Sequence, residues 1–183
     1  MLVALIAPLA LQAAVAVPLA FVERDLTGDG EPEVLRVVGV GPSIDELDVT
    51  FTIESGGAEV YRTALAPLTR TVGFDAGRRE LSADEHRTRL IEFGAWFFGE
   101  GKFQSPSAFV ESLTASAPGR VPQIPEVIAS DRPGPLPVDG RAIWDEIRAA
   151  PVTIFGFSPG GDTVEAIGWS PSRGRFFRLL ECC

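Results

Sequence analysis

Basic side chains, histidine and cysteine are scarce in this 183-residue chain. Lys and Arg together number 16, against 25 Asp and Glu, and the formal net charge is −9. A nucleic-acid binder needs a surplus of Lys and Arg to neutralise phosphates, so we expect no nucleic-acid partner. One His and two Cys do not supply a four-ligand zinc site or a disulfide-dense fold. Glycine (19) and proline (15) are also too few for a low-complexity chain.

Charge is missing altogether from residues 1–22, where Gln12 is the only polar side chain. An apolar run of this length is either a signal peptide or a membrane anchor. Pro8 interrupts the run, and Ala14-Val15-Ala16 matches the small-x-small pattern that signal peptidase reads. We therefore expect residues 1–16 to be a signal peptide and the mature chain to be extracellular or periplasmic. A retained N-terminal anchor, which would bring the chain to a membrane, and an internal apolar strand are the alternatives.

The most informative motif follows directly, over Asp25 to Glu33. Oxygen-bearing side chains stand at relative positions 1, 3, 5 and 9, with glycine at position 6 and a further carbonyl at position 7; these residues are Asp25, Thr27, Asp29, Glu33, Gly30 and Glu31. Calcium takes six to eight oxygen ligands, and a loop that curls around it needs glycine at its sharpest bend. Position 12 is Arg36 instead of an acid, so the loop is not a complete EF-hand.

The pattern resembles the strand–loop–strand calcium loops of FG-GAP and VCBS-type extracellular repeats, which run Asp-x-Asn/Asp-x-Asp-Gly-x-x-Asp before an apolar strand. The likeness covers about ten residues, and no family is indicated for the whole chain. It implies one calcium ion bound by Asp25, Thr27, Asp29, Glu31 and Glu33. The expected role is structural, because the ion would neutralise crowded carboxylates. A solvated, acidic, glycine-rich turn between two strands is the alternative.

Strands dominate both ends of the chain. The first half contains strand-like segments at 19–24, 33–40, 47–54 and 59–62, with period-2 alternation in the third and a Gly-Gly turn before the fourth. Near the C-terminus, two Gly-x-Ser-Pro turns spaced by 12 residues predict a three-stranded meander over 152–157, 163–169 and 175–181.

Helices are expected in the middle of the chain. Ser82 and Glu85 form a capping box that opens a helix through about Phe98, and Ser105-Pro106 starts a second helix. A third helix runs from the cap at Asp139 to Ala149, after a proline-rich strap at 117–138. The sequence thus predicts one α+β domain over 17–183: an N-terminal antiparallel sheet, three central helices and a C-terminal three-stranded β-meander.

Two sequence features could indicate a catalytic or ligand-binding site. Gly156-Phe157-Ser158-Pro159-Gly160 matches the nucleophile elbow of hydrolases, but another strand follows it, and the only histidine, His86, lies upstream instead of downstream. The aromatic cluster around Phe93 and Phe97 recurs at helical spacing, which is more typical of a core than of a ligand pocket. We interpret these features as structural and assign no catalytic residue.

The predicted function is an exported, bacterial, non-enzymatic binding or accessory domain with one structural calcium site and a protein or small-molecule partner. A small secreted hydrolase that uses Asp and Glu is one alternative. The other is a periplasmic interaction domain tethered through its C-terminal cysteines. Cys182 and Cys183 can bond to each other, either can link two chains into a disulfide-bonded dimer, or one can be buried and the other a free thiol. The acidity is concentrated in residues 23–59, where ten acids face two arginines for a net charge of −8. A divalent cation or a basic partner would relieve that charge.

Overall fold

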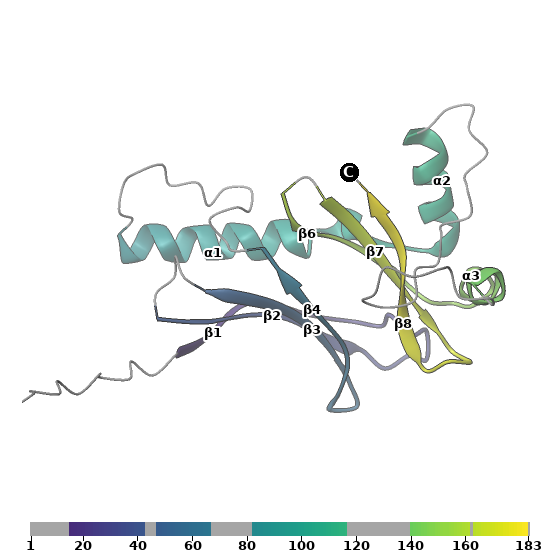
Figure 1. Ribbon diagram of the computed structural model, residues 1–183, viewed down its shortest axis with the longest axis horizontal. Helices are drawn as coiled ribbons and strands as arrows, with labels where there is room; N and C mark the ends of the chain where they lie inside the picture. The colour runs from purple at the N-terminus through teal and green to yellow at the C-terminus, as the bar shows by residue number, and fades with distance from the viewer. Residues whose placement is uncertain (1–14, 43–46, 67–81, 117–139, 162, 183) are drawn as a thin grey trace, which may run out of the picture.

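The computed structural model describes residues 15–42, 47–66, 82–116, 140–161 and 163–182. These residues form two antiparallel four-stranded sheets and three α-helices (Figure 1). The fold class is therefore mixed α+β, as predicted. The predicted proline-rich strap at 117–138 and the cap at Asp139 lie outside the described residues.

The first sheet is a meander in which each strand pairs with the next, in the order β1 (Val15–Arg24), β2 (Glu33–Gly41), β3 (Asp48–Ser55) and β4 (Ala58–Leu65). Side chains alternate between its two faces, so β2 buries Leu35 and Val37 completely. The predicted Gly-Gly turn joins β3 to β4, and both glycines have a positive φ (55° and 82°) that suits a tight hairpin.

Strand β1 begins inside the apolar run that the sequence assigns to a signal peptide. Val15 pairs with Gly41 and Ala16 pairs with Val40. The strand thus begins two residues before Val17, the predicted first residue of the mature chain. The end of the apolar run, from Val15 onward, is thus an edge strand of the sheet. Cleavage after Ala16 would shorten β1 by two residues and leave the rest of its pairing with β2. Residues 1–14 lie outside the described part of the chain.

The helices begin where the sequence predicts. Helix α1 (Ala83–Phe97) has the full capping box: Ser82 Oγ accepts the Glu85 amide at 3.3 Å, and the Glu85 carboxylate accepts the Ser82 amide at 2.9 Å. Helix α2 (Pro106–Ser116) starts after Ser105, and α3 (Gly140–Ala149) turns its apolar face inward. None of the helices in the described ranges is long and apolar enough to span a bilayer.

The second sheet corrects the predicted three-stranded meander, because it has four strands: β5 (Phe103–Gln104), β6 (Ile154–Gly160), β7 (Thr163–Ser170) and β8 (Arg175–Cys182). The last three form the expected meander. The additional strand, β5, pairs with β6 and follows a short 3-10 helix, η3 (Glu100–Lys102). Two residues are too few to show an alternation of hydropathy, so the sequence pattern does not predict β5.

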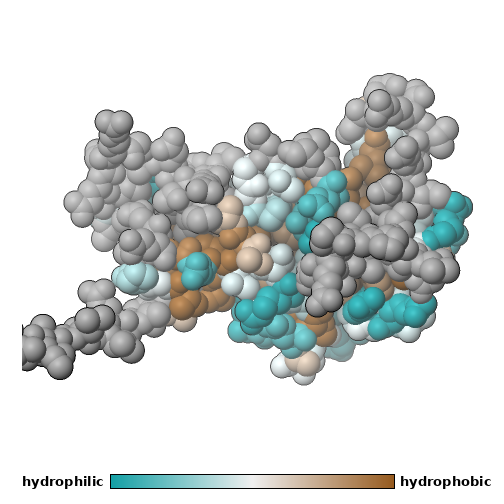
Figure 2. All heavy atoms as spheres, viewed as in Figure 1, coloured by the Kyte–Doolittle hydropathy of each residue, from teal (hydrophilic) through white to brown (hydrophobic). Residues whose placement is uncertain are grey.

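Two hydrophobic clusters hold the layers together. The first fills the space between the first sheet, α1 and the second sheet, and Phe51 of β3 lies at its centre. The second cluster packs α2 and α3 on the opposite face of the second sheet, with Trp144 and Ile147 of α3 buried. On the face shown in Figure 2, apolar side chains gather where α1 crosses the first sheet. The second sheet is therefore covered on both faces.

Candidate functional site

The loop from Asp25 to Glu33 joins β1 to β2 and sits against the second sheet. Leu26 is fully buried, and its carbonyl accepts a hydrogen bond of 3.1 Å from the Thr153 amide, which precedes β6. Gly28 has a φ of +77°, and a Cβ at this position would lie 2.6 Å from the Pro151 carbonyl oxygen. The loop therefore connects the two sheets, and glycine is required where it approaches the chain at Pro151.

Glu33 anchors the loop from inside. Its side chain is buried, and Oε2 accepts the backbone amides of Leu26 at 2.7 Å and Thr27 at 3.3 Å. Oε1 accepts the hydroxyl of Thr27 at 3.1 Å and the hydroxyl of Ser55 at 3.2 Å. Four donors thus surround the carboxylate and occupy its acceptor sites. A buried carboxylate needs such partners, because burial without them is strongly unfavourable.

The other acids of the loop lie on its outer side. Asp25 accepts the amides of Gly28 at 2.7 Å and Gly30 at 3.0 Å, one on each carboxylate oxygen, and Asp29 accepts the amide of Glu31 at 2.9 Å. Asp29 and Glu31 are exposed. Each of these carboxylate oxygens has a second lone pair available for another partner.

The structure therefore divides the five predicted ligands into two groups. Thr27 and Glu33 contact one another on the buried side, while Asp29 and Glu31 are exposed and Asp25 is half-buried. Within the described ranges, no group of three or more His, Cys, Asp or Glu side chains has the arrangement of a metal site. All five residues offer oxygen atoms, which is the donor type that calcium prefers.

A cleft beside the loop was not foreseen from the sequence. It has a volume of about 520 Å³ and lies between the end of β1, the start of α2 and the connection from α3 to β6. Arg24 and Arg148 both line it, together with Phe103 and Ser105. We call it the arginine cleft. Its residues come from three distant segments, so only the tertiary structure brings them together; the two arginines stand out in the sequence only as basic residues in an acidic chain.

Two further clefts contain little that suggests catalysis. One, of about 260 Å³, lies between α2 and the second sheet and is lined by Lys102 and Glu165. The other, between β1 and α1, is lined by apolar residues. Among the described residues, Glu165 is the one acid that lines any of these three clefts, and its Oε2 lies 3.3 Å from Arg178 Nε. The predicted hydrolase alternative requires two acids that converge in a cleft, and these three do not provide them.

The other residues that the sequence offers as catalytic or ligand-binding candidates belong to strands or to the core, as far as the structure describes them. The Gly156–Gly160 segment is not the predicted turn but part of the strand β6, and it pairs with β7, the next element along the chain. A strand follows it instead of a helix, so it does not have the strand-to-helix geometry of a nucleophile elbow. Phe93 and Phe97 are buried in the first cluster, which confirms the interpretation as core. The side chain of His86, the side chain of Cys182 and the whole of Cys183 lie outside the described residues.

Electrostatics outside the loop support the packing of the second sheet. Burial alone would lower the pKa of Arg178, but the carboxylates of Glu165 and Glu181 raise it above its usual value. Burial would raise the pKa of Glu146, but hydrogen bonds from Ser170 and Ser172 and the charge of Arg173 lower it. These charged groups hold neighbouring strands and a turn together.

Comparison of the chain with protein-family models, with curated proteins and with solved structures finds no match.

Proposed function

We propose that the chain is an exported, non-enzymatic binding or accessory domain that works outside the cytoplasm, with one structural calcium ion in the Asp25–Glu33 loop. The observation that carries the proposal is the position of the loop at the junction of the two sheets, where Leu26 is buried and bonded to Thr153. An ion bound there would stabilise the contact between the sheets, which is a structural role.

The residues of the loop suit a calcium ion chemically. Asp25, Asp29 and Glu31 place three carboxylates in one short loop, the first half-buried and the other two exposed, and like charges at close range repel one another. A hard cation removes that repulsion and accepts their oxygen atoms as ligands. Thr27 and Glu33 either keep their present hydrogen bonds and hold the loop from the buried side, or give up some of these hydrogen bonds and bind the ion instead.

A weak site is enough for this role. Extracellular calcium modules bind with dissociation constants of about 10⁻⁴–10⁻³ M. At several millimolar calcium, such a site contributes about 1–2 kcal/mol to the free energy of unfolding. In a chain of this size the contribution raises the melting temperature by a few degrees.

The test is a set of melting curves. Protein stripped of metal on a chelating resin is melted with and without about 5 mM calcium chloride, a concentration well above the expected dissociation constant. Calcium should raise the melting temperature of the wild-type chain, and Asp25→Ala with Asp29→Ala should abolish that rise. Glu92→Ala with Glu111→Ala is the matched control, because it removes two exposed acids from α1 and α2. If the melting temperature of the wild-type chain is the same with and without calcium, the ion site is refuted.

A further inference from the structure

We propose that the arginine cleft binds a small molecule that carries two or more carboxylate or phosphate groups. The volume of the cleft, about 520 Å³, falls within the range of about 300–1,000 Å³ that is typical of small-molecule sites. The proposal does not depend on the calcium loop, because none of the five predicted calcium ligands lines the cleft.

The charge of the cleft is opposite to that of the molecule. Among the residues that the structure describes, Arg24 and Arg148 line it and no Asp or Glu does, although acids outnumber bases by 25 to 16 in the whole chain. Among the described residues, no carboxylate forms an ion pair with either arginine; Arg24 Nη1 donates to the neighbouring Glu23 carbonyl at 3.0 Å. An arginine guanidinium is a permanent cation in proteins. The two guanidinium groups are therefore available to an anion from solution.

Aromatic rings support both arginines. The Arg24 guanidinium lies 5.4 Å from the centre of the Phe103 ring, and the Arg148 guanidinium lies 5.9 Å from the centre of the Trp144 ring. Attraction between a cation and a ring face restricts where each guanidinium can go. Less conformational freedom is then lost when an anion binds.

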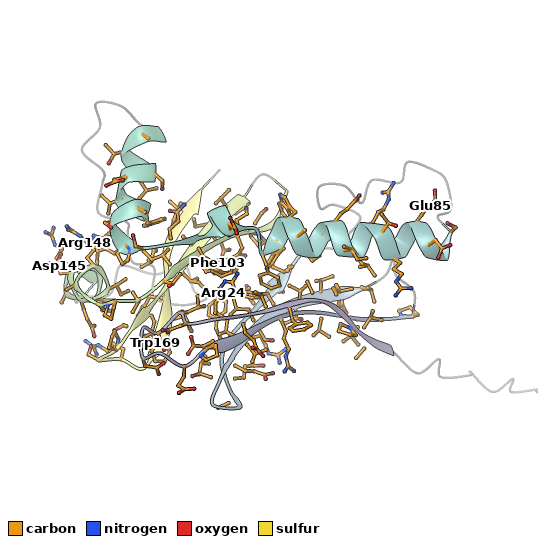
Figure 3. All side chains as sticks on the ribbon, turned by 180° about the vertical axis from the view of Figure 1, so that it is seen from behind. Arg24, Glu85, Phe103, Asp145, Arg148 and Trp169 are labelled. Atoms are coloured by element: carbon orange, nitrogen blue, oxygen red, sulfur yellow. The ribbon has the colours of Figure 1, made fainter. Side chains whose placement is uncertain are left out.

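The placement of the arginines favours a ligand with more than one anionic group. Figure 3 shows Arg24 beside Phe103 near the middle of the molecule, and Arg148 on α3 toward one end. Ser105 and Ser107 also line the cleft, with hydroxyl oxygens 3.0 Å apart. Serine hydroxyls can donate hydrogen bonds to carboxylate or phosphate oxygens, and a planar guanidinium binds either group through two parallel hydrogen bonds.

The experiment measures the affinity of defined anions by isothermal titration calorimetry. Acetate carries one carboxylate, succinate two and citrate three, while phosphate and pyrophosphate form a second series. Metal is removed beforehand on a resin, because soluble chelators are themselves polyanions. The salt concentration is held at about 0.05 M to limit screening. A member of one series that carries several anionic groups should bind at millimolar concentration or below, and at least about tenfold more tightly than acetate or single phosphate.

Three variants decide whether the cleft is responsible. Arg24→Gln and Arg148→Gln should each weaken the best polyanion about tenfold, toward the affinity of the corresponding single anion. Arg87→Gln is the matched control, because Arg87 is an exposed arginine of α1 outside the cleft, and it should leave the affinity unchanged. Circular dichroism establishes that each variant is folded. The proposal is overturned if no polyanion binds at millimolar concentration, or if Arg87→Gln weakens binding as much as the other two substitutions.

Discussion

At the scale of single residues, Glu33 organises the loop between β1 and β2 from its buried side. Its buried carboxylate accepts two backbone amides and two hydroxyls, and these donors come from Leu26 and Thr27 at the start of the loop and from Ser55 at the end of β3. Hydrogen bonds to a charged acceptor are stronger than neutral ones. Glu33 therefore determines the path of the chain between β1 and β2.

Replacing Glu33 tests this role directly. Glu33→Ala leaves the buried amides of Leu26 and Thr27 without their acceptor and should lower the free energy of unfolding by about 2–4 kcal/mol. Glu33→Gln should lower the free energy of unfolding by less than Glu33→Ala does, because the carboxamide oxygen can still accept both amides. Urea denaturation of metal-free protein measures both. Glu31→Ala, which removes an exposed acid of the same loop, should change stability by less than about 0.5 kcal/mol; equal losses for Glu33→Ala and Glu31→Ala would contradict the role.

At the scale of secondary-structure elements, Glu146 fastens α3 to the turn between β7 and β8. Its carboxylate accepts the hydroxyl of Ser170 at 2.7 Å, and the amide and hydroxyl of Ser172 at 2.5 and 2.8 Å. These bonds connect residues 24 and 26 positions apart. Burial opposes the charge, but the hydrogen bonds and Arg173 outweigh burial and lower the pKa of Glu146.

The lowered pKa predicts how this contact depends on pH. A carboxylate whose pKa is lower in the folded chain stabilises the fold above its unfolded pKa, and the contribution is lost as the pH falls through the folded pKa. Glu146→Gln should therefore be less stable than wild type at pH 7, by about 1 kcal/mol because the group is near solvent. The difference should shrink in the acid range below 4.5, the ordinary pKa of Glu. Urea denaturation at pH 7, 5 and 3 measures it, and a difference that does not change with pH would contradict the assignment.

At the scale of the whole molecule, one aromatic cluster joins the two sheets. The Phe51 ring of β3 lies 5.5 Å from Phe97 of α1, and 5.5 and 5.2 Å from Phe155 and Phe157 of β6, between ring centres. Aromatic contacts of this kind add to the free energy gained by burying the rings. Because neither sheet keeps its buried face without the other, we expect the two sheets to unfold together.

A substitution at Phe51 tests the shared core. Phe51→Ala should lower the free energy of unfolding by about 3–5 kcal/mol, and far-ultraviolet circular dichroism and tryptophan fluorescence should follow one common transition. Phe21→Ala is the matched control: it lies in the same sheet, but the Phe21 side chain is 72% exposed, so its loss should change stability little. Two separate transitions in the Phe51→Ala protein would show that the sheets unfold independently.

Local patterns account for the elements that the sequence predicts well. The capping box at Ser82 and Glu85, the start of α2 at Ser105-Pro106 and the alternation in β3 depend on neighbours within a few residues. The same holds for the Gly-Gly turn between β3 and β4. The sequence does not predict the strand β5, because two residues cannot show a periodic hydropathy pattern and its partner β6 is about fifty residues away along the chain.

The sequence by itself determined the mixed α+β class, the boundaries of most elements and the oxygen-rich loop, because each of these follows from propensity, capping or spacing over a short stretch. Only the tertiary structure decided that the loop lies at the junction of the sheets and that Glu33 faces inward. It also brought Arg24 and Arg148 to one cleft. The physical reason is that burial, hydrogen-bond partners and concave surfaces depend on residues far apart in the chain, and these become neighbours only when the layers pack.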